Sequence, residues 1–133
     1  MVNNINKNDI LKKSINLLIS LFQKGDYKKA EILAISISKK NPSVLMCWKI
    51  LGIIYLNRGK INKALHANQK ALKLAPNAPD INNNMSITFN NLGRYEESIN
   101  YSKKALEIDK NFIQAYGNLI DSLKAIKKYE DAY

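Results

Sequence analysis

The sequence predicts an all-α protein built from repeated pairs of antiparallel helices, and three observations support this fold class. Five glycines and three prolines in 133 residues are too few for the many tight turns of a β-sandwich or β-barrel. Hydrophobic residues make up 46% of the chain and charged residues 24%, which is typical of a globular domain. Most decisively, a set of residues recurs along the chain at one fixed period.

The repeat period is 34 residues, and a glycine marks the same place in successive units. Gly25, Gly59 and Gly93 follow one another at this spacing, and Lys127 stands at the next step. Two further series keep the same period, namely small residues five positions after the glycine and prolines near the end of the unit: Ala30, Ala64, Ser98 and Ala132, and Pro42 and Pro76.

This register divides the chain into an N-terminal segment and four units. We expect residues 1–10 to lead into the first helix, followed by units at 11–44, 45–78, 79–112 and 113–133, the last of them incomplete. Two helices are expected in each unit. The predicted helices cover 9–23, 28–40, 44–57, 61–74, 79–91, 95–108 and 112–126, and an eighth begins at 129.

Glycine and proline explain where these helices end. Glycine readily adopts the left-handed conformation that terminates many helices, so Gly59 and Gly93 predict the end of the first helix in their units. Proline lacks an N–H group and restricts the residue before it, so Pro42 and Pro76 predict the end of the second helix. Apolar residues inside the predicted helices recur with helical spacing, which indicates one buried face.

The second unit is the most informative part of the sequence. It resembles a tetratricopeptide repeat at eight positions: Trp48, Leu51, Gly52, Tyr55, Gly59, Ala64, Ala71 and Pro76. With the other units, the resemblance covers residues 11–133. It implies a right-handed α-solenoid of about three and a half repeats and a role in protein–protein interaction. In this family the first helices line a concave groove and the second helices form a convex back.

Asparagines recur on the predicted first helices, at a position that faces the groove in this family. The sixth position of the unit reads Asn16, Ile50, Asn84 and Asn118. An amide donates and accepts hydrogen bonds, so such a row suits the backbone of an extended peptide. Except at Ile50, it resembles the asparagine ladder in the tetratricopeptide region of O-linked N-acetylglucosamine transferase. The other candidate groove residues are Asn57, Asn83, Asn90, Asn91, Lys12, Lys49, Asp80, Asp121 and Lys124.

Composition offers an alternative explanation of the asparagines and of the charge. The chain has 19 lysines, 18 asparagines and 18 isoleucines, all encoded by A/T-rich codons. Its net charge of +10 suggests acidic partners, and many lysines fall on the outward faces of the second helices. Such a face also keeps a solenoid soluble. Nucleic-acid contact through this basic convex face is the weakest functional alternative.

The sequence indicates no catalytic or metal site. His66, the only histidine, falls at an outward position of a second helix among polar residues, and Cys47 is the only cysteine, so we expect neither a nucleophile–histidine pair nor a Cys/His zinc site. A single cysteine and the lack of a signal-like segment favour a cytoplasmic location. No stretch reaches the ~20 apolar residues that span a membrane. We therefore expect no enzyme activity, no cofactor, no metal and no membrane partner.

Two hypotheses for the function follow. The first is the binding of an extended peptide or partner segment in the groove, within the N-terminal part of a larger protein, such as a recruiting region of a glycosyltransferase or sulfotransferase. The second is a self-association or scaffold module without a groove ligand. The chain stops early in the last predicted helix, so Leu119, Ile120 and Leu123 lack a full partner and predict a homodimer through this end. The sequence gives no account of Asn82, which replaces Trp48 and Tyr116 at an equivalent position.

Overall fold

The protein is a row of α-helices stacked in the order of the sequence. The computed structural model describes residues 2–132, with side chains from Asn6 onward, and no strand occurs in that range. The helices are α1 (Val2–Gln23), α2 (Tyr27–Lys40), α3 (Leu45–Asn57), α4 (Ile61–Leu74), α5 (Pro79–Asn91), α6 (Tyr95–Ile108) and α7 (Ile113–Asp131). Met1 and Tyr133, the outer ends of the first and last predicted segments, lie outside the described residues.

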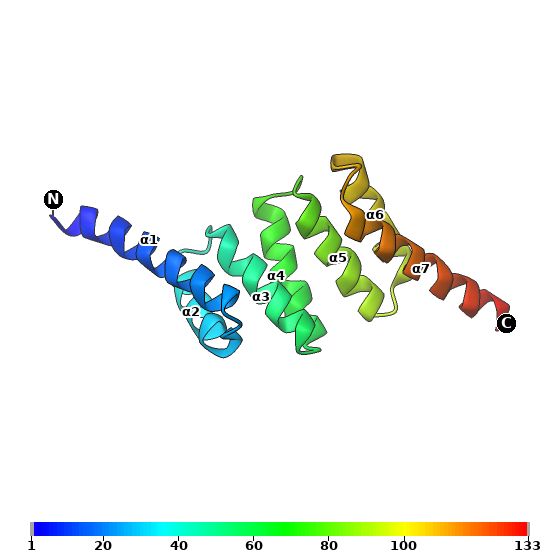
Figure 1. Ribbon diagram of the computed structural model, residues 1–133, viewed down its shortest axis with the longest axis horizontal. Coiled ribbons are helices and arrows are strands. Elements are labelled where there is room, and N and C mark those ends of the chain that lie inside the picture. Colours follow the sequence, from blue (N-terminus) through cyan, green and yellow to red (C-terminus); the bar gives the residue numbers. More distant parts are fainter. Residues whose placement is uncertain (1, 133) are drawn as a thin grey trace.

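Figure 1 shows an elongated solenoid with the two termini at opposite ends. Each helix packs against the next, and the first helices of successive pairs, α1, α3, α5 and α7, also pack against one another. No comparable contact joins α2 to α4, or α4 to α6, within the described part of the chain. The first helices therefore form a continuous layer, while the second helices stand apart. The prediction of an all-α solenoid is confirmed.

Glycines end the first helices as predicted. Gly59 and Gly93 have φ angles of 72° and 75°, in the left-handed region. The N–H of the following residue, Lys60 or Arg94, donates to a carbonyl five positions earlier at 2.9 Å in both cases. This bond satisfies one of the carbonyls that the helix end leaves without a partner.

Two predicted helix boundaries are wrong, because the residues that would end a helix are missing there. No second helix begins at 129, since α7 continues without a break from Ile113 to Asp131. Lys127 takes the place of the glycine, and a left-handed conformation is costly for a lysine. At the other end, α1 begins at Val2 rather than at 9, and no glycine or proline interrupts residues 2–10.

Small residues of the repeat are buried between the helices. Ala64, Ala71 and Ala105 are fully buried, and so is Ser86, which replaces the glycine of the second unit. Gly52 meets the side chain of Asn68 on α4 so closely that no Cβ could be accommodated without a shift. No helix within residues 2–132 is both long and apolar enough to cross a membrane.

Candidate functional site

The layer of first helices holds an open hollow between α3, α5 and the start of α7. Its volume is about 580 Å³. Its wall contains both polar and apolar residues, which are Ile53, Leu56, Asn57, Asp80, Asn83, Asn84, Ile87, Asn91, Phe112 and Gln114. A site of this size with a few amides among apolar side chains is suited to a peptide segment. Sequence reasoning did not single out Ile53, Ile87, Phe112 or Gln114.

Five of the twelve predicted groove residues line this hollow, namely Asn57, Asp80, Asn83, Asn84 and Asn91. The others lie along the same row of first helices but outside the hollow. On α1 and α7 they are exposed or half-buried: Lys12, Asn16, Asn118, Asp121 and Lys124. Lys49 and Asn90 make contacts with neighbouring first helices.

Three asparagines of the hollow keep their side-chain amides free. Asn84 is half-buried, and Asn57 and Asn91 are exposed. Within residues 6–132, none of these three side chains makes a hydrogen bond to another residue. Each can therefore offer one donor group and one acceptor group to a bound molecule.

Two other predicted groove asparagines use their N–H groups inside the protein. Asn118 Nδ2 on α7 donates to Asn83 Oδ1 on α5 at 2.5 Å. Asn90 Nδ2 donates to Ser122 Oγ at 2.8 Å, which again joins α5 to α7. These amides join the third and fourth units, and Asn118 retains its Oδ1 and one N–H for a ligand.

Behind the hollow lies a buried network of hydroxyl groups that sequence reasoning missed. Ser98 Oγ on α6 donates to the Ser86 carbonyl at 2.8 Å, and it lies 2.8 Å from Ser122 Oγ. Ser86 Oγ in turn contacts the hydroxyls of Ser98 and Ser102. All four serines are fully buried. For Ser86 and Ser98 the signal in the sequence was a serine at the position that holds Gly52 or Ala64 in the second unit.

Asn82, for which the sequence gave no role, closes the turn before its own helix. Its Nδ2 donates to the carbonyls of Pro76, at 3.1 Å, and Ala78, at 2.8 Å. At the equivalent position of the second unit, Trp48 also donates to the carbonyl six residues before it, but through an indole N–H: its Nε1 lies 2.8 Å from the Pro42 carbonyl oxygen. Tyr116 donates through its hydroxyl to the carbonyl six residues before it, at 3.2 Å. The shared requirement is one donor at this position, and tryptophan, asparagine and tyrosine all supply it.

An ion pair lies at one edge of the hollow. Lys49 Nζ on α3 is 2.6 Å from Asp80 Oδ2 on α5. Burial raises the pKa of the Cys47 thiol to about 11, so this thiol is protonated near neutral pH and is a poor nucleophile. No group of three or more His, Cys, Asp or Glu side chains suited to a metal ion occurs among the described residues.

Comparison with known proteins identifies the repeat. Two family models, both for the tetratricopeptide repeat, match residues 46–78 and 79–112, together half of the chain. The chain belongs to the tetratricopeptide repeat family. Tetratricopeptide repeats bind protein partners, so the coarse function of this chain is that of a protein-interaction module. A search of curated proteins finds no match.

Solved tetratricopeptide structures share the fold at low sequence identity. A Thermobaculum terrenum O-GlcNAc transferase mutant matches with a TM-score of 0.78 and 19% identity over 85% of this chain and 22% of that one. MamA from Desulfovibrio magneticus matches with a TM-score of 0.76 and 19% identity over 91% and 72% of the two chains. The Yersinia enterocolitica type III secretion chaperone SycD, in complex with a peptide of the translocator YopD, gives 0.77 and 18% over 92% and 95%. This chain thus spans about a fifth of the transferase chain and most of the other two.

Proposed function

We propose that this tetratricopeptide chain binds an extended segment of a partner protein in the hollow between α3, α5 and α7. The observation that carries the proposal is the set of free amides on Asn57, Asn84 and Asn91 beside the apolar side chains of Ile53 and Ile87. The amides pair with peptide N–H and C=O groups whatever the peptide sequence, and the apolar residues accept its side chains.

The other predicted groove residues extend this site along the first helices. Asn16 on α1 and the remaining N–H and oxygen of the Asn118 amide on α7 continue the row at either end. Charged side chains along the row then select the peptide by its charge. They are the Lys49–Asp80 ion pair, the exposed Lys12 on α1, and the exposed Asp121 and Lys124 on α7. A similar solenoid in another protein, SycD, holds a peptide of its translocator, which supports the use of this scaffold for a peptide.

The test is to select peptides from a random library on the wild-type protein and to measure their affinities by fluorescence anisotropy. Asn57→Ala/Asn84→Ala should weaken every groove-binding peptide about tenfold, because each lost hydrogen bond contributes about 0.5–1.5 kcal/mol. Asn77→Ala/Asn100→Ala removes two exposed amides that do not line the hollow and should change nothing. If the first variant binds all selected peptides as tightly as wild type, the groove proposal fails.

A second candidate function is self-association through the free face of α7. Ile113, Tyr116, Ile120 and Leu123 form one apolar stripe on this helix, and each is between 47% and 77% exposed. An exposed apolar stripe of this kind marks an interaction surface, and we propose that a second copy of the chain covers it. SycD, which shares the fold, has also been solved as an alternative dimer.

Light scattering over a range of concentrations tests this second candidate. Wild type should show a concentration-dependent dimer, and Ile120→Glu/Leu123→Glu should remain monomeric because it places charge in the interface. Ile32→Glu, at an equally exposed isoleucine on α2, serves as the control and should dimerise like wild type. A wild type that stays monomeric at every concentration rules out this candidate.

A further inference from the structure

The opposite face of the solenoid carries two further hollows, one on each side of α4. They exist because the second helices stand apart, so that α5 forms the floor between α4 and α6, and α3 forms the floor between α2 and α4. The first has a volume of about 520 Å³ and the second about 440 Å³. His66 on α4 lines both of them.

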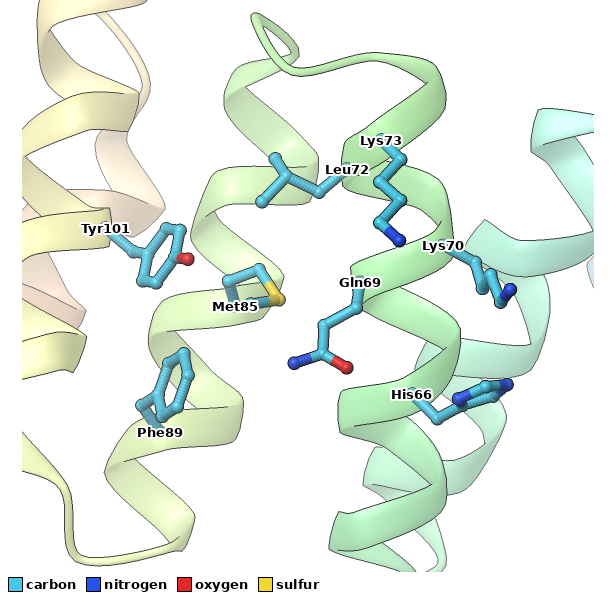
Figure 2. A pocket seen from close by; sticks show the side chains of 8 residues that line it. All are labelled: His66, Gln69, Lys70, Leu72, Lys73, Met85, Phe89 and Tyr101. Carbon is cyan, nitrogen blue, oxygen red and sulfur yellow. The ribbon is translucent and has the colours of Figure 1, made fainter.

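The hollow between α4 and α6 has an apolar floor. Figure 2 shows Met85 on α5 between Leu72 on α4 and Tyr101 on α6, with Phe89 further along α5. The rings of Phe89 and Tyr101 stack with their centroids 5.5 Å apart and their planes 10° apart. Because Phe89 is only 5% exposed and stacks on Tyr101, its ring offers little surface for a nucleobase to stack on. The floor suits a bulky apolar side chain instead.

The rim of the two hollows is basic. Lys63, His66, Lys70 and Lys73 recur at intervals of three and four residues, so they lie along one face of α4. Lys39 on α2 adds a further basic group to this rim. The described residues that line the two hollows include no aspartate or glutamate.

The basic stripe is specific to α4, and part of it is unpaired. The equivalent positions on α6 hold Glu97, Asn100, Lys104 and Glu107, so the repeat itself does not require four basic groups. Within residues 6–132, neither Lys70 nor Lys73 forms an ion pair. Like charges at this spacing repel one another, and an anionic partner would relieve that repulsion.

We propose that the hollow between α4 and α6 binds an acidic peptide segment that carries a bulky apolar side chain. The apolar side chain enters between Leu72, Met85 and Tyr101, and a carboxylate beside it meets the ammonium group of Lys73. A carboxylate that continues over α4 meets Lys70, whose side chain is directed away from Met85 and Tyr101 in Figure 2. This site lies on α4, α5 and α6 away from the hollow of α3, α5 and α7, so it does not depend on the groove function. A chain with both sites holds two different segments at once.

The probe is a fluorescein-labelled peptide of glutamates with a central Leu-Phe pair, and its binding is measured by anisotropy. Wild type should bind this peptide, and Lys70→Glu/Lys73→Glu should bind it at least about tenfold more weakly, because attraction becomes repulsion at the contact. Lys7→Glu/Lys13→Glu changes the net charge equally at exposed positions on α1 and should keep the wild-type affinity. Asn57→Ala/Asn84→Ala, which alters only the other hollow, should also bind like wild type.

Two matched probes separate the site from general attraction between opposite charges. Replacing Leu-Phe with Ser-Ser in the peptide should abolish the binding that depends on Lys70 and Lys73. An oligonucleotide of the same charge should bind more weakly than the peptide. The proposal is overturned if the Ser-Ser peptide binds equally well, if the oligonucleotide binds more tightly, or if the α1 variant loses as much affinity as Lys70→Glu/Lys73→Glu.

Discussion

Replacing Gly52 with alanine should destabilise the protein, although alanine forms helices better than glycine. Gly52 lies inside α3 and faces Asn68 on α4. An alanine Cβ would come within 2.9 Å of Asn68 Cγ and still closer to its Oδ1. Asn68 is 1% exposed, and its Nδ2 donates to Thr88 Oγ1 on α5 at 3.1 Å. The amide therefore cannot move aside without breaking a buried hydrogen bond.

Three contributions determine how much Gly52→Ala changes the free energy of unfolding. Overpacking a core costs about 1–3 kcal/mol. A buried hydrogen bond that is lost on one side costs about 1–3 kcal/mol. The higher helix propensity of alanine stabilises the folded protein by about 1 kcal/mol and offsets part of this cost. We therefore expect Gly52→Ala to lower the free energy of unfolding by about 3 kcal/mol and the melting temperature by about 10 °C.

Urea denaturation followed by far-UV circular dichroism measures this change, and Gly117→Ala is the matched control. Gly117 also lies inside a first helix, but an added Cβ there would meet no neighbouring atom within 4 Å, so alanine should stabilise by up to about 1 kcal/mol. In an Asn68→Ala background the cost of Gly52→Ala should largely vanish. If Gly52→Ala is as stable as wild type, or if its cost persists without Asn68, then the close approach to Asn68 does not explain this glycine.

Two further predictions concern buried groups. Burial raises the pKa of Cys47 from 9.0 to about 11, so the unfolded thiol ionises at a lower pH than the folded one. The free energy of unfolding should therefore fall between about pH 9 and 11, and it should fall further in wild type than in Cys47→Ala. Identical dependence of unfolding free energy on pH in the two proteins would contradict this. Ser98→Ala should cost about 1–2 kcal/mol in urea denaturation, because Ser86 and Ser122 lose a buried partner. Ser36→Ala, at a serine of α2 outside the network, should cost nothing measurable, and equal effects of the two variants would argue against the network.

The sequence predicted the helices best where glycine and proline mark their ends. The observed bounds of α2 to α6 agree with the prediction to within one residue. The two failures, at the start of α1 and within α7, occur where neither residue is present, so that nothing local stops a helix. The end of α6 at Ile108 was predicted although no proline follows it, so the repeat register and the single glycines and prolines together predict these boundaries.

The candidate groove was predictable only in part, for a geometrical reason. The repeat register placed Asn57, Asn84 and Asn91 on the first helices, and the structure places all three around one hollow. Register does not specify how far one unit is rotated relative to the next. The pairing of Asn118 with Asn83 depends on that rotation and could not be foreseen. The unit boundaries, the cytoplasmic location and the role as part of a larger enzyme remain predictions.

The buried polar contacts distinguish one junction between units from the next. Asn68 meets Thr88 where the second unit adjoins the third, whereas Ser98 meets Ser122 where the third adjoins the fourth. If the third unit were replaced by a copy of the second, Ala64 would stand in the place of Ser98, and the hydroxyl of Ser122 would lose that bond. Repeat proteins are prone to joining the wrong units during folding, and mismatched junctions of this kind carry a penalty. The buried hydrogen bonds between units therefore depend on the order of the units, and one repeat cannot replace another without losing such a bond.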